Sequence, residues 1–341
     1  MLLLVVLVLV PGRGASGVRQ YRVLCTLPVR AHLPPCTMQG LGAVFAVLFL
    51  VVCAHGWIVV SPSNASAVLP SGGGDVRFLA GTYTPDACSW SPEEFFASLD
   101  IQGAGSSLTI IDCGGQPWLT ASQFVSLRIR GLTIINADHA LQADLSNVAV
   151  EDMACNRSGS CLNIEAQSVT LTAISVSQAS SNVMVTATVE LTISEAHFQD
   201  VQSSGGGGAL QLQAKKLSMT NVTISRAHAR DGNGGAILIT DPTMVASVHM
   251  ANIRVDTASA SGTGGAVDIQ GTSIHLVTIQ DMWAFNTSAP RGGGALHLGT
   301  EKEMRLSNIS LEKCRAPGGE CRCWCLVVPC RATRLELSHV S

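Results

Sequence analysis

The chain has 341 residues, a formal net charge of −3 and only 13% charged residues, with no basic run beyond its N-terminal region. This charge balance disfavours nucleic acid as a partner. Hydrophobic residues make up 47% of the sequence but aromatic residues only 4%. We therefore expect a narrow core of stacked aliphatic side chains, in which bulky rings fit poorly.

Residues 1–56 have the pattern of a targeting leader. A 13-residue apolar stretch, Leu41–Cys53, precedes Ala54-His55-Gly56, with small residues where a signal peptidase needs them. We expect cleavage after Gly56, with the residues before Met38 as an upstream extension or a gene-model artefact. The alternative is an uncleaved signal anchor over 41–60, which is long enough to span a membrane. Arginines before it would leave the C-terminal bulk outside the cytosol. Both readings place the rest of the chain in the secretory pathway.

Residues 57–74 are rich in Pro, Ser and Gly and are predicted to form a linker. The first strands of the fold are expected at Asp75–Tyr83, Leu99–Gly105 and Leu108–Cys113. We therefore assign the folded domain to residues 75–341. Because the chain ends at Val340-Ser341, within a predicted strand, we also expect this domain to be truncated.

An apolar–x–apolar strand recurs along the whole domain, and period-two alternation is strand geometry. The first apolar residue of each copy lies at positions 108, 132, 148, 174, 191, 222, 253, 277, 309 and 340, about 26 residues apart on average. A small or apolar residue follows most copies, at Ala137, Met153, Ala179, Ala196, Ala227, Ala258, Met282 and Cys314. These aligned columns predict stacked turns.

Four copies of Gly-Gly-Ala, each followed by alternating apolar residues, mark the second half of the domain. Their alanines are Ala209, Ala236, Ala266 and Ala295, and a period of this length is typical of stacked-repeat proteins. The glycines allow backbone angles that other residues resist, and the alanine needs little room. With two or three short strands per turn, the sequence predicts an all-β parallel β-helix of about nine to ten rungs.

Several motifs resemble those of known β-helix families. Leu79–Tyr83, Ile101–Gly105 and Thr109–Cys113 resemble the start of right-handed parallel β-helix proteins of the pectin-lyase-like superfamily. The Gly-Gly-Ala units resemble repeats of the polymorphic outer membrane proteins, although their companion Phe-x-x-Asn motif is missing from the expected places. The resemblance covers about residues 76–341 and implies the fold rather than an activity. Right-handed winding also agrees with the general rule for parallel crossovers.

Nine cysteines follow residue 56, and in an oxidising compartment they are expected to form disulfides. Cys155 and Cys161 are predicted to close a short loop, and the odd total leaves one cysteine over. A second group consists of Cys314, Cys321, Cys323, Cys325 and Cys330. It could bind zinc, but its spacing matches no standard ligand pattern. We therefore predict no metal and no cofactor.

Five Asn-x-Ser/Thr sequons are candidate glycosylation sites, at Asn64, Asn156, Asn221, Asn286 and Asn308. Asn221 and Asn308 directly precede predicted strands. Their side chains could instead stack as an asparagine ladder, in which case they would not be glycosylated.

No catalytic constellation is visible in the sequence. Enzymes of the pectin-lyase-like fold need carboxylates gathered on one face, together with a basic residue or a second acid. The aspartates of this chain are scattered, and most lie in predicted corners, where Asp is common.

The best candidate surface site is a histidine pair. His197 and His228 end similar tetrapeptides, 194–197 and 225–228, in successive copies, so they could stack about 5 Å apart. The alternative is that they are simply two histidines at a solvent-exposed edge.

A column of hydroxyl side chains is a further candidate surface, although β-propensity alone favours Thr in strands. Its members are Thr109, Thr133, Ser175, Thr192, Thr223, Thr278 and Ser310, and Ala149 and Arg254 interrupt it.

The sequence therefore predicts a non-catalytic extracellular or cell-surface β-helix that serves adhesion or binds a glycan or a protein. The alternative is a polysaccharide lyase or glycoside hydrolase of the same fold, with carboxylates that converge only in three dimensions.

Overall fold

The computed structural model divides the chain into two compact units, Met1–Gly56 and Trp57–Ser341. It describes residues 8–12, 20–24, 57–65, 75–92, 96–122, 124–240, 247–271, 274–299, 303–316, 326–327 and 334–340. In the first unit, β1 (Val8–Gly12) pairs antiparallel with β2 (Gln20–Leu24). The expected signal segment, residues 41–56, lies outside the described residues. Within the described part, no helix is long and apolar enough to cross a membrane.

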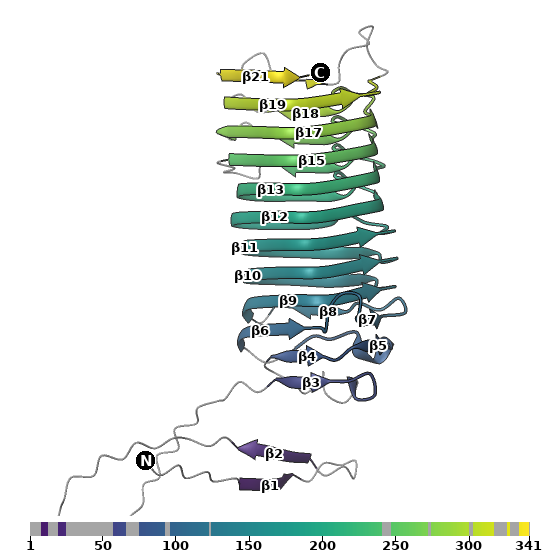
Figure 1. Ribbon diagram of the computed structural model, residues 1–341, viewed down its shortest axis with the longest axis vertical. Helices are drawn as coiled ribbons and strands as arrows, with labels where there is room; N and C mark the ends of the chain where they lie inside the picture. The colour runs from purple at the N-terminus through teal and green to yellow at the C-terminus, as the bar shows by residue number, and fades with distance from the viewer. Residues whose placement is uncertain are drawn as a thin grey trace, which may run out of the picture. The chain divides into compact units, whose positions relative to one another are not determined.

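The second unit is a parallel β-helix, as predicted, in which each strand pairs with a strand of the next turn (Figure 1). Twelve strands follow one another along its longest face. They are β3 (Ile58–Val60), β4 (Val76–Phe78), β6 (Phe96–Gln102), β9 (Phe124–Ile135), β10 (His139–Asn156), β11 (Ser160–Ser177), β12 (Val183–Ser203), β13 (Leu210–Ala229), β15 (Ser247–Ala260), β17 (Leu276–Ser288), β19 (Glu303–Glu312) and β21 (Arg334–Val340).

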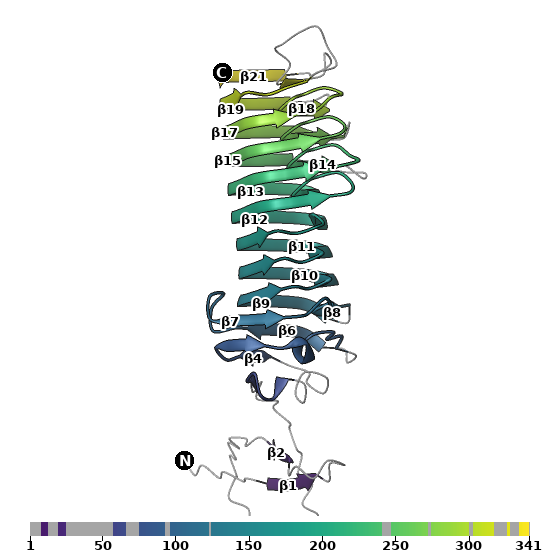
Figure 2. The same cartoon turned by 90° about the vertical axis from the view of Figure 1, so that its right-hand side faces the viewer.

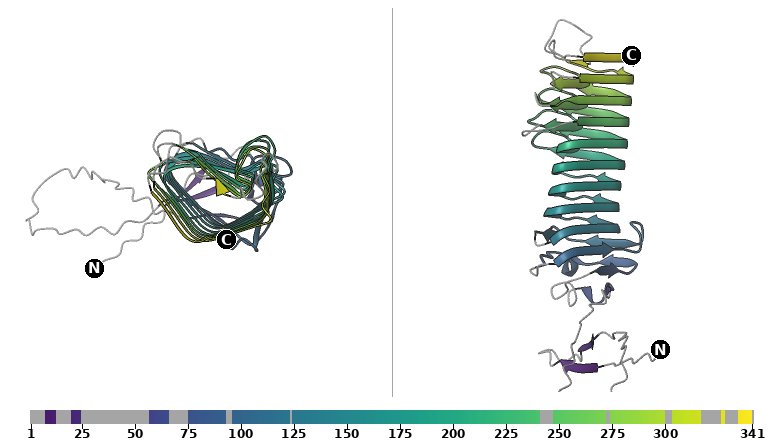
Figure 3. Two further views of the ribbon diagram at one scale, coloured as in Figure 1. Left: turned by 90° about the horizontal axis from the view of Figure 1, so that it is seen from above. Right: turned by 90° about the vertical axis from the view of Figure 1, so that its left-hand side faces the viewer.

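Shorter strands complete the turns on the other sides. They are β5 (Gly81–Tyr83), β7 (Thr109–Asp112), β8 (Leu119–Ala121), β14 (Ile237–Thr240), β16 (Val267–Gln270), β18 (Leu296–Gly299) and β20 (Leu326–Val327). Seen along the stack, successive turns superpose around one interior (Figure 3). The first of these turns includes β3, so Ile58–Val60 belong to the solenoid although we expected a linker there.

Two corners per turn have a left-handed backbone, and they lie five residues apart. The first corner is formed by Gly131, Asp152, Ala173, Glu195, Asn221, Asn252, Asp281, Asn308 and His339. The second corner is formed by Asn136, Arg157, Gln178, Asp200, Arg226, Thr257, Asn286 and Lys313. Asn, Asp and Gly tolerate this conformation best, which explains why Asn recurs before the strands.

The true register corrects the predicted columns. Leu132 aligns with Met153 and Ile174, whereas Val148, Leu191 and Val277 belong to a parallel column that precedes the first corner. Each turn thus contributes two apolar–x–apolar strands, and the predicted column alternated between them. The long face has twelve strands rather than nine to ten turns, because β3, β4 and β6 begin the stack before β9. The turns lengthen from 21 residues (Leu132 to Met153) to 31 (Val222 to Ile253).

Gly-rich arches account for the added length, and they lie on one side of the stack (Figure 2). Gly207, Gly234 and their equivalents have φ near +65°, as a tight corner requires. The glycine that follows lies against the next turn: a Cβ on Gly235 would lie 2.1 Å from the carbonyl oxygen of Gly265. The alanines of the motif are fully buried. The prediction for Gly-Gly-Ala is therefore confirmed.

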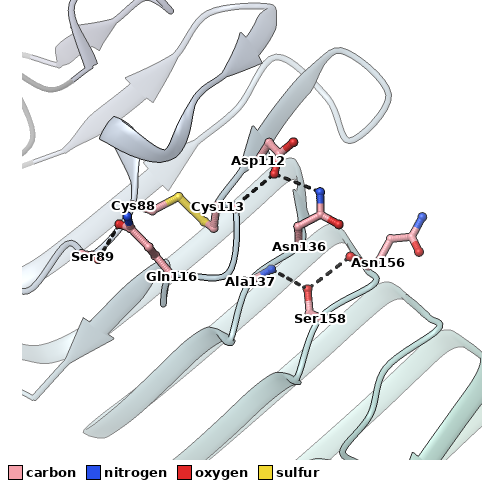
Figure 4. The surroundings of a disulfide bond; sticks show 10 residues. Cys88, Ser89, Asp112, Cys113, Gln116, Asn136, Ala137, Asn156 and Ser158 are labelled. Atoms are coloured by element: carbon pink, nitrogen blue, oxygen red, sulfur yellow. Dashed lines mark hydrogen bonds between the residues drawn. A yellow bond between two sulfur atoms is a disulfide. The ribbon is translucent and has the colours of Figure 1, made fainter.

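Two disulfides tie the N-terminal turns. The predicted bond between Cys155 and Cys161 is present, with an S–S distance of 2.06 Å. A second one joins Cys88 to Cys113 at the end of β7 (Figure 4). Beside it, Asn136 donates a hydrogen bond to Asp112, so the disulfide region is also linked to the second corner of the next turn. Residues 321–325 and Cys330 of the predicted cysteine group lie outside the described residues.

Candidate functional site

Two aromatic side chains project from the short face between the two corners. Trp283 and Phe285 stand two residues apart on β17 and therefore point to the same side of the strand. Their rings are stacked, with centroids 5.5 Å apart and an interplanar angle of 2°. Both residues are half-buried, and Nε1 of Trp283 donates a hydrogen bond of 3.1 Å to Glu312. The pair is thus a fixed aromatic element on a face where polar residues precede and follow it, Arg254 in the turn before and Ser310 in the turn after.

Two cations extend this stack. The Arg254 guanidinium lies 4.5 Å from the centroid of Trp283, and the Lys313 ammonium lies 4.7 Å from that of Phe285. Each such contact stabilises an exposed cation by about 0.5–1 kcal/mol. Neither cation pairs with a carboxylate among the described residues. The rings therefore hold two positive charges in place, two turns apart, and leave them able to bind an anion.

A groove of about 570 Å³ lies around the second corner, next to Phe285. Its wall is a polar ladder with one side chain per turn: Gln202, His228, Ser259, Ser288 and Arg315. Asp200, Arg226, Thr257 and Asn286, from the corner itself, form the rim. Parallel strands repeat about every 4.8 Å, so the groove presents a regular row of hydrogen-bonding groups.

The charges of the groove are unevenly compensated. Arg226 binds both carboxylate oxygens of Asp200, and this contact holds the pKa of Asp200 below its ordinary value. Nδ1 of His228 lies 2.5 Å from Oγ of Ser259. Arg315 forms no ion pair with any described residue. With Arg254 and Lys313, it makes three cations that form no ion pair with a described residue, and we call them the cationic strip. Asp256 and Glu312 stand at the strand position between Arg254 and Lys313.

A second cavity, of about 470 Å³, lies near the N-terminal end of the solenoid. Asp75, Asp100 and Arg128 are among its lining residues. Burial raises the pKa of Asp100 above its ordinary value, although Arg130 lies only 3.2 Å away and opposes this shift. The cavity therefore holds one carboxyl group that resists ionisation and another nearby.

A buried carboxylate, that of Asp268, lies beneath the Gly-rich arches. Asp268 on β16 has no exposed surface, and it accepts hydrogen bonds from Thr263 and from Nε2 of Gln270. Nδ1 of His297, in the next turn, lies 3.0 Å from the other carboxylate oxygen. All its contacts are within the protein, so this group joins two turns of the solenoid.

The structure does not bring His197 and His228 together. His197 aligns with Thr223 on the face between the corners, whereas His228 aligns with Gln202 beyond the second corner. Both histidines stand two residues after a left-handed corner residue, but after different corners of the turn. The predicted stack is therefore wrong, although His228 contributes to the groove.

The five sequons lie in different surroundings. Asn221 and Asn308 occupy the first corner, where Asn252 donates to Asn221 and Asn308 donates to Asp281, each at 2.7 Å. A short ladder therefore exists, but it joins only neighbouring turns. Oδ1 of Asn64 accepts a hydrogen bond from the amide of Ser61, and Oδ1 of Asn156 is buried. Asn286 is exposed at the second corner and lines the groove.

The predicted hydroxyl column is also two columns. Thr133, Ser175, Thr223 and Ser310 share the face of Trp283, whereas Thr192 and Thr278 stand before the first corner. Thr109 is fully buried. A continuous hydroxyl ladder is therefore not present along this face.

Sequence reasoning missed Trp283, Phe285 and Lys313. A signal did exist, because Arg254 interrupted the hydroxyl column and Trp283 holds the aligned position in the next turn. As for metals, no three His, Cys, Asp or Glu side chains within the described ranges are arranged to hold an ion.

No protein-family model matches the sequence, nor does the sequence of any curated protein. A similar solved structure is the catalytic unit of a thermostable GH87 α-1,3-glucanase from Streptomyces thermodiastaticus strain HF3-3. The two chains share 12% identity with a TM-score of 0.31, over 83% of this chain and 68% of the other. A likeness this low carries no argument about activity.

Proposed function

We propose that the solenoid is a non-catalytic extracellular binding protein whose ligand is an anionic glycan. The cationic strip of Arg254, Lys313 and Arg315 supports this proposal, because these three cations form no ion pair with a described residue although the chain has a net charge of −3. Carboxylate or sulfate groups on successive sugars would meet these cations. Sugar hydroxyls would bind the polar ladder of the groove, which repeats once per turn.

The two disulfides support an extracellular setting, since such bonds persist in oxidising compartments. The groove supports binding of an extended polymer rather than of a small molecule, because the ladder that lines it continues over five turns.

The test is binding to immobilised glycans, using the full chain secreted from a eukaryotic host. We expect sulfated or uronic-acid polymers to bind and neutral polymers to bind much less. Replacing Arg254, Lys313 and Arg315 together by Gln should weaken binding by about 100-fold, since charge-assisted contacts contribute about 1.5–3 kcal/mol each before screening. Binding should also weaken as salt rises.

The matched control removes the same charge elsewhere. Arg77, Lys215 and Lys216 are exposed and lie away from the groove, so their triple Gln variant should bind like the unmodified chain. Equal loss in both variants would show that only net charge matters and would contradict a defined site.

A second candidate function is polysaccharide cleavage at the cavity that holds Asp75 and Asp100. The presence of Asp75 and Asp100 in one cavity favours it, because polysaccharide hydrolysis uses a pair of carboxyl groups, and burial shifts the pKa of Asp100 upward. This function predicts release of reducing ends or unsaturated products from a polysaccharide, and loss of that release in Asp100→Asn. Binding without any cleavage would favour the first function.

A further inference from the structure

We infer that the groove is occupied by the N-glycan that the chain carries on Asn286, and that this glycan regulates access of the external ligand. The second part of this inference, that the glycan regulates access of the external ligand, rests on the proposed function. The first part, that the glycan occupies the groove, does not need the external ligand. Asn286 differs from the other sequon asparagines because it alone lines the groove.

The sequon is built into the groove wall. Asn286 sits at the second corner with φ +53°, and Ser288, which supplies the sequon hydroxyl, is a rung of the polar ladder. Thr287 between them points inward and is 1% exposed. The two residues that define the sequon therefore face the groove, and the residue between them faces the core.

The asparagine amide is directed along the groove. Nδ2 of Asn286, the atom that carries an N-glycan, lies 3.4 Å from Oγ1 of Thr257 in the preceding turn. Thr257 is itself part of the rim. A sugar attached at Nδ2 would start over Thr257 and next meet Ser259 and His228, which lie on the ladder in that turn and the one before it.

The groove suits such an occupant. A branched glycan offers hydroxyls to side chains that donate and accept, and the ladder supplies both kinds through Gln202, His228 and Ser259. A volume of about 570 Å³ is sufficient for several sugar rings. Because the glycan is tethered, its effective concentration at the groove is in the millimolar range. Weak contacts would thus be enough to keep it there and to block a free glycan.

The first experiment measures whether the glycan lies in the groove and needs no ligand. Full-length protein secreted from a eukaryotic host is treated under native conditions with an amidase that removes N-glycans, and release is followed at each site by mass spectrometry. We expect release at Asn286 to be about tenfold slower than at Asn64, which follows the first strand of the solenoid and lies outside the groove. Replacing the ladder residues Gln202 and His228 by Ala should abolish the difference. An unmodified Asn286, or equal release rates in the unaltered protein, would overturn the inference.

The second experiment measures regulation. Ser288→Ala removes the sequon but keeps Asn286, and we expect this variant to bind a sulfated polymer about tenfold more tightly than the glycosylated chain. Ser66→Ala, which removes the Asn64 sequon away from the groove, is the control and should change nothing. Equal affinity of all three proteins would overturn the regulatory half. If none of them binds any polymer while release at Asn286 is slow, the proposed function fails and the occupied groove stands.

Discussion

The carboxylate of Asp268 lies 3.0 Å from Nδ1 of His297 in the following turn, although Asp268 has no exposed surface. Leu238 holds the aligned position in the preceding turn and is also buried. The site beneath the arches therefore accepts either an apolar side chain or a fully hydrogen-bonded polar one. What it should not accept is a carboxylate that has lost a partner.

This relationship predicts the outcome of a double-mutant cycle. His297→Leu should lower the free energy of unfolding by about 1–3 kcal/mol, because a buried carboxylate loses a hydrogen-bond partner. Asp268→Leu combined with His297→Leu should recover part of that loss, since the buried carboxylate is then gone, whereas Thr263 and Gln270 lose their acceptor. Urea unfolding of the four proteins measures the coupling. A double variant less stable than His297→Leu would contradict the account.

Two aspartates should give opposite pH dependences of stability. Burial raises the pKa of Asp100 in the folded state. The contribution of Asp100 to folding stability is therefore present at low pH and is lost as the pH rises through that pKa. Hydrogen bonding to Arg226 lowers the pKa of Asp200, so its contribution is present above the unfolded-state pKa and is lost as the pH falls through the folded-state value.

The measurement is the melting temperature of Asp100→Asn and Asp200→Asn from about pH 3 to about pH 7, a range that spans ordinary carboxyl pKa values. The melting temperature of Asp100→Asn, relative to that of the unmodified chain, should increase as the pH rises. The relative melting temperature of Asp200→Asn should decrease. The second effect should be small because the Asp200–Arg226 pair is exposed. Trends of the same sign in both variants would contradict the assignment.

The arches predict a sharp difference between two glycines. Gly235→Ala should destabilise the solenoid by about 3 kcal/mol or more, because the new Cβ would lie 2.1 Å from the carbonyl oxygen of Gly265 in the next turn. Gly205→Ala should cost little, since the nearest atom would be 3.9 Å away. Thermal unfolding of both variants, monitored by circular dichroism, checks this. Equal tolerance of the two changes would mean that the arches are not in contact.

The fold was predictable from the sequence because its strongest signals are local. Gly-Gly-Ala marks an arch, and alternation marks a strand, whatever the neighbouring turns contain. The register of the strands could not be predicted from the sequence, because each turn carries two similar strands. Val148 and Met153 are five residues apart and both begin an apolar–x–apolar strand, so an alignment can pass from one column to the other without losing its pattern.

The same ambiguity determined what could be predicted of the site. His197 and His228 were matched because small residues precede both, and only strand pairing shows that they follow different corners. The contacts of Trp283 and Phe285 with Arg254 and Lys313 were not foreseen, because the two cations come from the neighbouring turns, which loops separate in the sequence. The spacing of left-handed residues, such as Asn221 and Arg226, is the signal that fixes the register.

That spacing leads to a prediction about stability at the corners. Ala173 occupies the first corner with φ +54°, a conformation that costs a residue with a Cβ about 1–2 kcal/mol. Glycine avoids this cost but loses about 0.5–1 kcal/mol of backbone entropy. Ala173→Gly should therefore stabilise the solenoid, by up to about 1 kcal/mol, as measured by the urea midpoint.

The control is Ala154, which lies in β10 one turn away and has an extended backbone. Both alanines are half-buried, so the two changes remove the same methyl group from similar surroundings. Ala154→Gly has no strain to relieve and should destabilise by about 0.5–1 kcal/mol. Opposite signs for the two variants would show that Ala173 is strained in the left-handed region, because only the backbone angle distinguishes the two sites. A loss of stability in both would mean that Ala173 is not held in the left-handed region.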